Sequence, residues 1–369
     1  MNKLINIVKK NPIVCIAWAL AIVTCFMVPP DKEYFAYFDY KTLVCLFCAL
    51  SVVCALKNIY FFRIVAQKII CVFKNTRSAI IALVYITFIG SMLIANDMAL
   101  ITFLPLGYFV LSDTNHKELM SFTFIMQNIA ANLGGMLTPF GNPQNLYLYS
   151  YFNIPTAEFF KIMFIPFIVS VTLITICCLF VKREELALTS GEGDLQLNRR
   201  KSIIYIILFV LSVAIVFNVV NFIVGAVIIT AAIIYFDREA FSDVDYGLLL
   251  TFCAFFIFSG NLARVDAIKN LLIGAVENNT LLFSVLSCQI ISNVPSAILL
   301  SKFTANYPAL LIGVNIGGAG TLIASLASLI TLGQYSKYNP GKAKNYIIQF
   351  SIYNFSMLAI LFAVSMLVL

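Results

Sequence analysis

Long apolar stretches alternate with short polar segments along the whole chain. A helix needs about 20 apolar residues to cross a hydrocarbon core of about 30 Å. Apolar stretches close to this length run over 12–28, 41–56, 157–181, 202–218, 220–236, 246–262 and 345–369. The pattern therefore predicts an all-α polytopic membrane protein.

Four further apolar stretches are interrupted by polar residues. Those at 78–111 and 280–301 carry a break centred on Asn, and those at 119–151 and 306–333 contain Gly, Pro, Asn, Thr and Ser in the middle. Non-helical backbone at membrane depth is tolerated only inside protein or beside a water-filled cavity. We therefore expect the first pair to form re-entrant hairpins, the second pair to form broken transmembrane helices, and function to lie at the interruptions.

Composition agrees with a membrane setting. The chain is 61% hydrophobic and 11% charged, with a mean hydropathy of +0.96, whereas soluble domains are about 45–50% apolar and about 25% charged. A soluble enzyme, a secreted disulfide scaffold and a disordered chain are excluded. The ten Cys lie mainly in apolar stretches and are expected to be small buried hydrophobes. The net charge of +7 resides mostly in the polar breaks, so it indicates membrane topology rather than nucleic-acid binding.

A hydrophilic segment divides the chain into two halves. Residues 1–181 form a first predicted repeat, and 182–201 form a cytoplasmic linker rich in charged residues. A connecting helix follows at 202–219, and a second repeat occupies 220–369. We predict that the linker separates two related units of one transporter-like fold.

The two halves share polar landmarks in the same order. An Asp-Tyr pair opens a span in each half, at Asp39 and at Asp245. An Asn then interrupts each hairpin, at Asn96 and Asn293, and a Gly-Gly pair leads into each broken helix. Paired interrupted helices in corresponding positions are typical of transporters with internal repeats, whose binding site lies where the repeats meet.

Counting crossings predicts that the repeats are inverted. If the 78–111 hairpin enters and leaves on one side, five crossings precede the second repeat, so that repeat begins on the opposite side. With the N-terminus in the cytoplasm, the first hairpin enters from the cytoplasm and the second from outside. All but six of the 24 Lys and Arg residues then lie on the cytoplasmic side, which agrees with the positive-inside rule. The six exceptions are Lys32, Lys41, Lys161, Arg264, Lys269 and Lys302.

The hairpin tips are the first candidate binding elements. Asn96 and Asn293 each offer a donor and an acceptor beside helix ends, although both could serve only as helix caps. Asp97 is the only acidic residue at predicted membrane depth. A buried carboxylate must be protonated, paired or bound to a cation, so Asp97 is a candidate proton carrier or cation ligand, unless helix-end N–H groups satisfy it. Asn96, Asp97 and Asn293 are the candidate ligands of a coupling Na⁺.

The broken helices supply the second set of candidates. Each Pro in the string from Thr138 to Pro143 removes an N–H donor and unwinds the helix, and Gly permits close approach of backbone or an ion. The second half has Gly, Thr and Ser without Pro, and a pure packing role for these small residues remains open. Helix N-termini at such breaks favour an anion, while free carbonyls favour a small cation. The full predicted substrate and ion site is Asn96, Asp97, Thr138, Pro139, Gly141, Asn142, Asn145, Ser292, Asn293, Gly318, Thr321 and Ser325.

These motifs resemble the ion transporter superfamily, which holds divalent anion/sodium symporters, citrate-transporter-like permeases and arsenite-efflux permeases. The resemblance covers nearly the whole chain. It implies two inverted repeats, each with a re-entrant hairpin and a broken helix. It also implies a homodimer whose transport domain moves against a scaffold in an elevator mechanism.

The hairpin tips differ from those of dicarboxylate members of the superfamily. Those members carry Ser-Asn-Thr at both tips, whereas this chain reads Ala-Asn-Asp around Asn96 and Ser-Asn-Val around Asn293. The tips are more similar to the arsenite and proton-coupled branches. The resemblance therefore leaves the substrate open and makes coupling through Asp97 plausible.

We expect a secondary active transporter for a small organic or inorganic anion, coupled to Na⁺ or H⁺. The alternatives within the superfamily are efflux of arsenite-like oxyanions and cation/proton antiport. An intramembrane enzyme is not favoured, because the lone histidine, His116, falls in a loop and Asp97 has no acidic partner at membrane depth. We expect no catalytic residues and no cofactor beyond the coupling ion. The expected partners are a small anionic solute, the lipid bilayer of the plasma (inner) membrane and a second copy of the chain.

Overall fold

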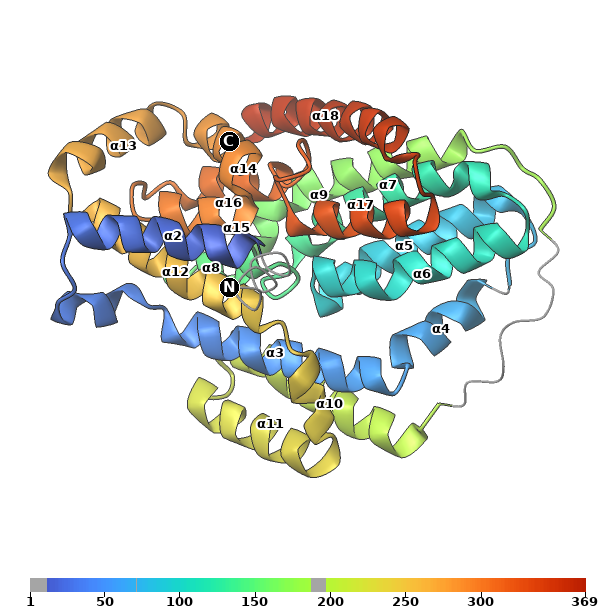
Figure 1. The fold of residues 1–369 in the computed structure, drawn as a ribbon, viewed down its shortest axis with the longest axis horizontal. Coiled ribbons are helices and arrows are strands. Elements are labelled where there is room, and N and C mark those ends of the chain that lie inside the picture. Colours follow the sequence, from blue (N-terminus) through green and yellow to red (C-terminus); the bar gives the residue numbers. More distant parts are fainter. Residues whose placement is uncertain (1–11, 71, 187–196) are drawn as a thin grey trace.

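The protein is a bundle of helices (Figure 1). The computed structural model describes residues 12–70, 72–186 and 197–369. Within these ranges the regular structure is helical, without a strand, and one isolated bridge pairs Asn75 with Glu185. The predicted all-helical polytopic fold is confirmed. The N-terminal Lys3, Lys9 and Lys10 and residues 187–196 of the predicted linker lie outside the described residues.

Several helices are suited to cross a membrane. Among the described residues, five are long and apolar enough by length and composition. They are α3 (Tyr40–Asn58), α5 (Thr76–Ile94), α9 (Thr156–Leu179), α12 (Tyr246–Ala263) and α18 (Ala343–Val368). Shorter apolar helices are α2 (Pro12–Met27), α11 (Phe222–Phe236) and α16 (Tyr307–Ile316).

Matching caps explain where the helices of each half begin. Asp39 accepts a hydrogen bond from the Thr42 N–H at the start of α3, and Asp245 accepts one from Leu248 at the start of α12. An Asn carboxamide does the same in front of α5 and of α14 (Thr280–Ile291). Such side chains satisfy first-turn N–H groups that have no intrahelical partner. The order of these caps is the same in both halves.

The helices are interrupted where the sequence carries polar breaks. Helix α5 passes to α6 (Asn96–Asp113) through the single residue Ala95, and α14 passes to α15 (Asn293–Leu300) through Ser292. We call residues 95–97 the first junction and 292–294 the second junction.

The two broken helices have matching architecture. Helix α7 (Met120–Gly134) is separated from α8 (Pro143–Tyr151) by the first break, residues 135–142, which begins with the short helix η3 (Gly135–Leu137). Helix α16 is separated from α17 (Leu326–Tyr338) by the second break, residues 317–325.

The remaining helices connect these elements. The predicted connecting helix is α10 (Arg199–Val216), and α4 (Phe61–Ile70) and α13 (Asp266–Asn278) precede α5 and α14. Helix α13 meets α14 at a bend of 116°. Short 3₁₀ helices lie at η1 (Lys32–Tyr37), η2 (Lys117–Leu119) and η4 (Arg238–Asp243).

The helices pack in two groups (Figure 1). Helix α2 packs on α12, while α10 and α11 pack on α3. In the second group, α5 to α9 pack with α14 to α18. Helices α4 and α13 lead from one group to the other, and α12 contacts α15 across the boundary between them.

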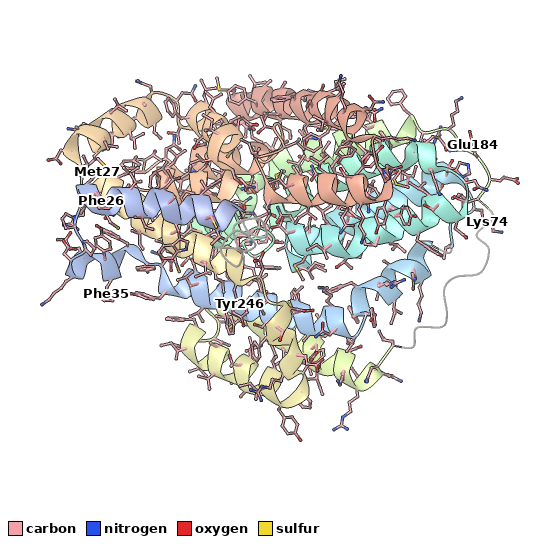
Figure 2. The ribbon with its side chains drawn as sticks, in the orientation of Figure 1. Phe26, Met27, Phe35, Lys74, Glu184 and Tyr246 are labelled. Atoms are coloured by element: carbon pink, nitrogen blue, oxygen red, sulfur yellow. The ribbon has the colours of Figure 1, made fainter. Side chains whose placement is uncertain are left out.

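The outer surface is apolar along the sides of the bundle. Phe26 is 85% exposed and Phe35 72% exposed, and both lie at the left end of the molecule, opposite Lys74 and Glu184 (Figure 2). Many more large apolar side chains are exposed on α10, α11 and α18. Exposed apolar surface of this extent marks an interaction with lipid or protein and fits a multi-pass membrane protein.

Candidate functional site

A central cavity of about 330 Å³ lies where several interruptions meet. The starts of α6, α8, α15 and α17 contribute to its lining, and α12 closes it from the other helix group. Five predicted site residues line it, and they come from both halves of the chain. These are Asn96, Asp97, Ser292, Asn293 and Ser325.

Four helix N-termini converge on this cavity. Each N-terminal turn carries backbone N–H groups without intrahelical partners and the positive end of a helix dipole. In these four helices, all within the described residues, the side chain of the N-cap residue accepts no hydrogen bond from the first turn. The backbone of these helix ends therefore contributes partial positive charge to the cavity lining.

The two junctions have nearly the same backbone geometry. Ala95 has φ 66° and ψ 153°, and Ser292 has φ 76° and ψ 160°. Glycine is normally required in this region, and another residue there costs roughly 1–3 kcal/mol. Directly after each, an Asn side-chain oxygen accepts the next backbone N–H, from Asp97 and from Val294, at 2.9 Å. Strain of this kind at two equivalent places is typical of functional sites.

Several predicted residues hold the first break instead of lining the cavity. The Asn145 amide donates to the carbonyls of Gly135, Met136 and Thr138 at 3.1–3.2 Å. The Thr138 hydroxyl donates to the Met92 carbonyl at 2.9 Å. Pro139 and Gly141 are buried within the break. These residues shape the backbone on which the lining side chains sit.

The second break is held by a residue that the sequence reasoning missed. The Gln289 amide of α14 donates to the Gly317 carbonyl at 2.8 Å, and its oxygen accepts from the Thr321 N–H at 2.8 Å. Thr321 also donates through its hydroxyl to the Gln289 carbonyl at 3.2 Å. Gly318 is buried beside Asn293, where an added Cβ would lie 3.1 Å from the Asn293 amide nitrogen. Thr321 and Gly318 therefore lie behind the residues that line the cavity and do not line it themselves.

Three buried amide side chains connect the two breaks, and none of them was predicted from the sequence as a site residue. They are Asn132, Gln144 and Asn315. The Asn132 Oδ1 accepts from the Asn96 Nδ2 at 3.1 Å and from the Ser325 hydroxyl at 2.8 Å. Asn315 accepts from Asn142 at 3.2 Å and from Gln144, a cavity-lining residue, at 3.3 Å. A signal was present, because Asn132 and Asn315 each stand two positions before a Gly-Gly pair.

Four buried polar atoms at this site have no hydrogen-bond partner among the described residues. They are the Asp97 Oδ1, Asn132 Nδ2, Asn142 Oδ1 and Gln144 Oε1. Buried polar atoms are nearly always paired, and an unpaired one costs about 1–3 kcal/mol. The Asp97 and Gln144 oxygens belong to residues that line the cavity and are available to a ligand there, whereas Asn132 and Asn142 lie behind the lining.

The charge in the cavity comes from carboxyl groups. None of the described lining residues is Lys, Arg or His, whereas Asp97 and Asp245 both contribute to the lining. Asp245 caps α12, while Asp97 lies half-buried at the start of α6. The candidate Na⁺ ligands Asn96, Asp97 and Asn293 line this one cavity. Within the described ranges, no cluster of three or more His, Cys, Asp or Glu could hold a metal ion, so a cation site around Asp97 would also need amide or hydroxyl oxygens.

A larger cleft of about 970 Å³ lies further along α6. Its α6 lining includes Ile101, Pro105 and Phe109, which continue the face of α6 that begins with Asp97. None of the predicted site residues lines it within the described chain. Acidic and basic side chains mix at its edge, and Lys57 lies 3.7 Å from Asp243. We assign the site to the smaller cavity because the interruptions and the unpartnered atoms meet there.

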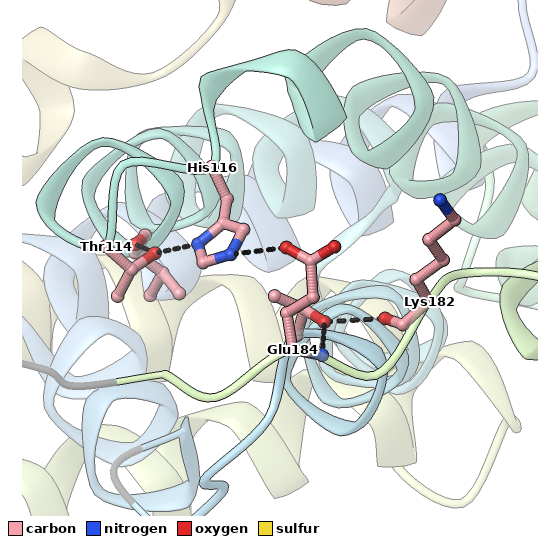
Figure 3. Close-up of polar contacts among 6 residues, drawn as sticks. Thr114, His116, Lys182 and Glu184 are labelled. Carbon is pink, nitrogen blue, oxygen red and sulfur yellow. Dashed lines mark hydrogen bonds and ion pairs between the residues drawn. The ribbon is translucent and has the colours of Figure 1, made fainter.

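The lone histidine lies away from this cavity. His116 contacts the Thr114 hydroxyl at 3.2 Å and the Glu184 carboxylate at 3.1 Å (Figure 3). The Glu184 backbone in turn pairs with Thr76 at the start of α5. His116 therefore ties the loop after α6 to the segment after α9, and it takes no part in the candidate site.

Comparison with known proteins agrees with this architecture. A family model described as citrate transporter matches residues 4–309. The chain belongs to the citrate transporter family. An uncharacterized transporter of Methanocaldococcus jannaschii is 36% identical over 81% of this chain and 82% of its own length. The inner membrane protein YbiR of Escherichia coli is 28% identical over 83% of both chains, and a Dictyostelium discoideum protein named arsB is 24% identical over 44% of this chain and 28% of its own.

Membership of the citrate transporter family confirms two predictions. The resemblance to the ion transporter superfamily holds, and the protein is a multi-pass membrane transporter rather than an enzyme.

Proposed function

We propose that this protein is a secondary active transporter that moves a small anion, coupled to Na⁺ or H⁺, through the central cavity. The observation that carries the proposal is the convergence of four helix N-termini on a cavity that also contains Asp97. Partial positive charge at helix N-termini binds anions. Asp97 repels the same anions unless a proton or a cation neutralises it. An anion and a coupling cation therefore bind together more favourably than either alone.

Two features support an elevator mechanism with inverted repeats. The order of caps, junctions and breaks is the same in both halves. All four helices that begin at the cavity belong to one packing group, while α12 of the other group covers it. In our proposal the group formed by α5 to α9 and α14 to α18 carries the solute, with α5–α6 and α14–α15 as re-entrant hairpins, and the group that contains α12 is a scaffold that dimerises.

A location in the plasma (inner) membrane with the N-terminus in the cytoplasm completes the proposal. The E. coli relative carries the name inner membrane protein. The distribution of Lys and Arg supports the orientation. In this orientation the larger cleft beside α6 opens to the cytoplasm and provides the approach to the cavity.

One observation favours a second candidate function. The described cavity lining contains two carboxyl groups and lacks basic side chains, which suits an uncharged hydroxylated solute. Undissociated arsenite has this chemistry, and one relative carries the name arsB. Efflux of such a solute in exchange for a cation or proton would use the same amide and hydroxyl groups.

Reconstitution distinguishes these candidates. The purified protein is placed in liposomes with imposed Na⁺ and pH gradients and screened with di- and tricarboxylates, sulfate, phosphate and arsenite. Our proposal expects gradient-driven uptake of at least one anion. Flux of arsenite alone would favour the second candidate, and absence of flux with every solute would contradict both.

Asp97→Asn tests the coupling role in the same liposomes. Asn keeps the shape of the side chain but neither ionises nor neutralises a bound cation, so we expect stimulation by the driving gradient to fall at least about tenfold. Asp266→Asn, at an exposed position on α13, should retain wild-type coupling. Wild-type coupling in Asp97→Asn would remove this residue from the mechanism.

A further inference from the structure

We propose that Asn132 and Asn315 are paired positioning residues, each of which holds the non-helical segment of the opposite half in the geometry that the solute site requires. The proposal rests on the assignment of transport to the central cavity. It concerns residues that lie behind the lining and act through the side chains that line it.

Asn132 joins three separate segments. It lies in the last turn of α7 and is 2% exposed. Its Oδ1 accepts from Asn96 of the first junction and from Ser325 at the end of the second break, at 3.1 Å and 2.8 Å. Its backbone carbonyl accepts from Asn142 of the first break at 3.2 Å. One buried residue therefore sets the relative positions of one junction and both breaks.

Asn315 makes the reciprocal connection from the second half. It lies in the last turn of α16 and is 1% exposed. Its Oδ1 accepts from Asn142 and Gln144, and its Nδ2 donates to the Asn145 oxygen at 2.6 Å. Its fourth bond, at 2.8 Å, returns to the Leu311 carbonyl of its own helix. Three of its four bonds therefore hold residues of the first half.

The two residues occupy equivalent places in the chain. Asn132 is followed by Leu-Gly-Gly and Asn315 by Ile-Gly-Gly. The same spacing then relates Thr138 to Thr321 and Asn142 to Ser325. Asn is unfavourable in helix interiors, and burying a polar side chain at membrane depth costs free energy unless it has hydrogen-bond partners. Recurrence at matched sites with cross-half partners therefore indicates a role in the site rather than in helix stability.

Gly318 lies where the second junction approaches both positioning residues. A Cβ at Gly318 would lie 3.1 Å from the Asn293 Nδ2, 3.3 Å from the Asn315 carbonyl oxygen and 3.9 Å from the Asn132 Oδ1. Both positioning residues therefore lie close to the second junction as well as to the breaks. A single hydrogen bond between membrane helices contributes only modestly to stability, so loss of one bond displaces a lining group without unfolding the protein.

A double-mutant cycle tests the proposal on the full chain in liposomes, with the solute that passes the transport screen. Asn132→Ala and Ser325→Ala remove the same bond from opposite sides. We expect each to raise KM about tenfold with kcat nearly unchanged. The double variant should have the KM of the more affected single variant, because no second bond remains to be lost. Asn315→Ala with Gln144→Ala should behave in the same way.

The controls separate positioning from general packing. Asn354 is fully buried in α18 and donates to the Phe350 carbonyl of its own helix, so Asn354→Ala should leave KM unchanged. Ser328→Ala removes a hydroxyl one turn beyond Ser325 that bonds Asn128 instead, and KM should again stay unchanged. If Asn132→Ala does not fold, the comparison of Ser325→Ala with Ser328→Ala decides the question.

Either of two results overturns the proposal. One is a KM within twofold of wild type in Asn132→Ala and Asn315→Ala, and the other is additive effects in both cycles. Thermal unfolding of the same variants gives a readout that needs no transport: the double variant should melt at the temperature of the less stable single variant. If the wild-type protein moves no solute, the proposed function fails, whereas the melting cycle still tests the connection between the halves.

Discussion

Gly135 illustrates how tightly single residues are packed at the first break. A Cβ there would contact the Asn142 Oδ1 and lie 2.8 Å from the Gly141 carbonyl oxygen. Backbone cannot yield as a flexible side chain does. The close approach that the site needs therefore depends on the missing side chain rather than on a special backbone angle.

Gly135→Ala is accordingly expected to abolish most transport while the protein still inserts and folds. The added methyl displaces Asn142 and with it the bonds to Asn132 and Asn315. Transport rate in liposomes, normalised to folded protein, should fall at least about tenfold. Gly274→Ala provides the matched control, because a Cβ at that helix position meets open space, and the helix should gain roughly 0.5–1 kcal/mol. Equal activity in the two variants would refute the packing argument.

At the scale of elements, helix ends are joined by polar contacts outside the membrane. Arg264, at the end of α12, donates to the Asp31 carboxylate at 2.6 Å and to the Tyr37 hydroxyl at 3.0 Å, and lies 3.3 Å from the Glu33 carboxylate. Asp31 also caps η1. The Arg264–Asp31 ion pair therefore joins the end of α12 to the segment that follows α2, and α2 is the helix on which α12 mainly packs.

This contact predicts a pH-dependent stability. The Arg264 guanidinium beside Asp31, with backbone N–H groups, holds the pKa of the Asp31 carboxyl below its ordinary value of 3.8. The folded state therefore gains stability above that pH and loses it as the pH falls through the lowered pKa. Arg264→Met should lower the melting temperature at pH 7, and the difference from wild type should narrow below pH 3.8. Lys269→Met, at an exposed site on α13, should show little difference at either pH. If the difference in melting temperature between Arg264→Met and wild type were the same at pH 7 and below pH 3.8, the ion-pair explanation would be contradicted.

At the scale of the whole molecule, inverted repeats place two loops on opposite sides of the membrane. Glu185 lies in the linker between the halves, and Asp266 begins α13 of the second half; both are exposed. Single cysteines at these positions, in a chain without its native Cys, should react with an impermeant maleimide from opposite sides. Permeabilised membranes should label both. Labelling of both from one side of intact membranes would reject the inverted topology.

Much of the architecture was predictable because it depends on local properties. Length and hydropathy set the spans, and the polar residues Asn96, Pro143 and Asn293 marked where a new helix begins after an interruption. The first junction, the second junction and both breaks appear where the polar residues predicted them. Side-chain caps such as Asp39 and Asp245 could also be recognised, because they act within three residues of their own position.

The division of labour within the site was not predictable in the same way. Thr138 and Asn145 were expected to bind ligands, yet they hold the first break, and Gln289 holds the second. Gln144 lines the cavity, although its neighbours in the string attracted the prediction. Whether an amide faces a cavity or a carbonyl depends on how the helices pack, which periodicity does not specify.

Amino-acid order alone is enough to establish the membrane class and the sequence of spans and interruptions, because each of these reflects whether a short segment can satisfy its backbone in lipid. The folded bundle was needed to assemble one cavity from segments remote in the chain. The Ser325–Asn132 bond joins residues 193 positions apart, and the Asn315–Asn145 bond joins residues 170 apart. Contacts of that range arise from packing two halves together, and no local pattern encodes which atoms will meet there.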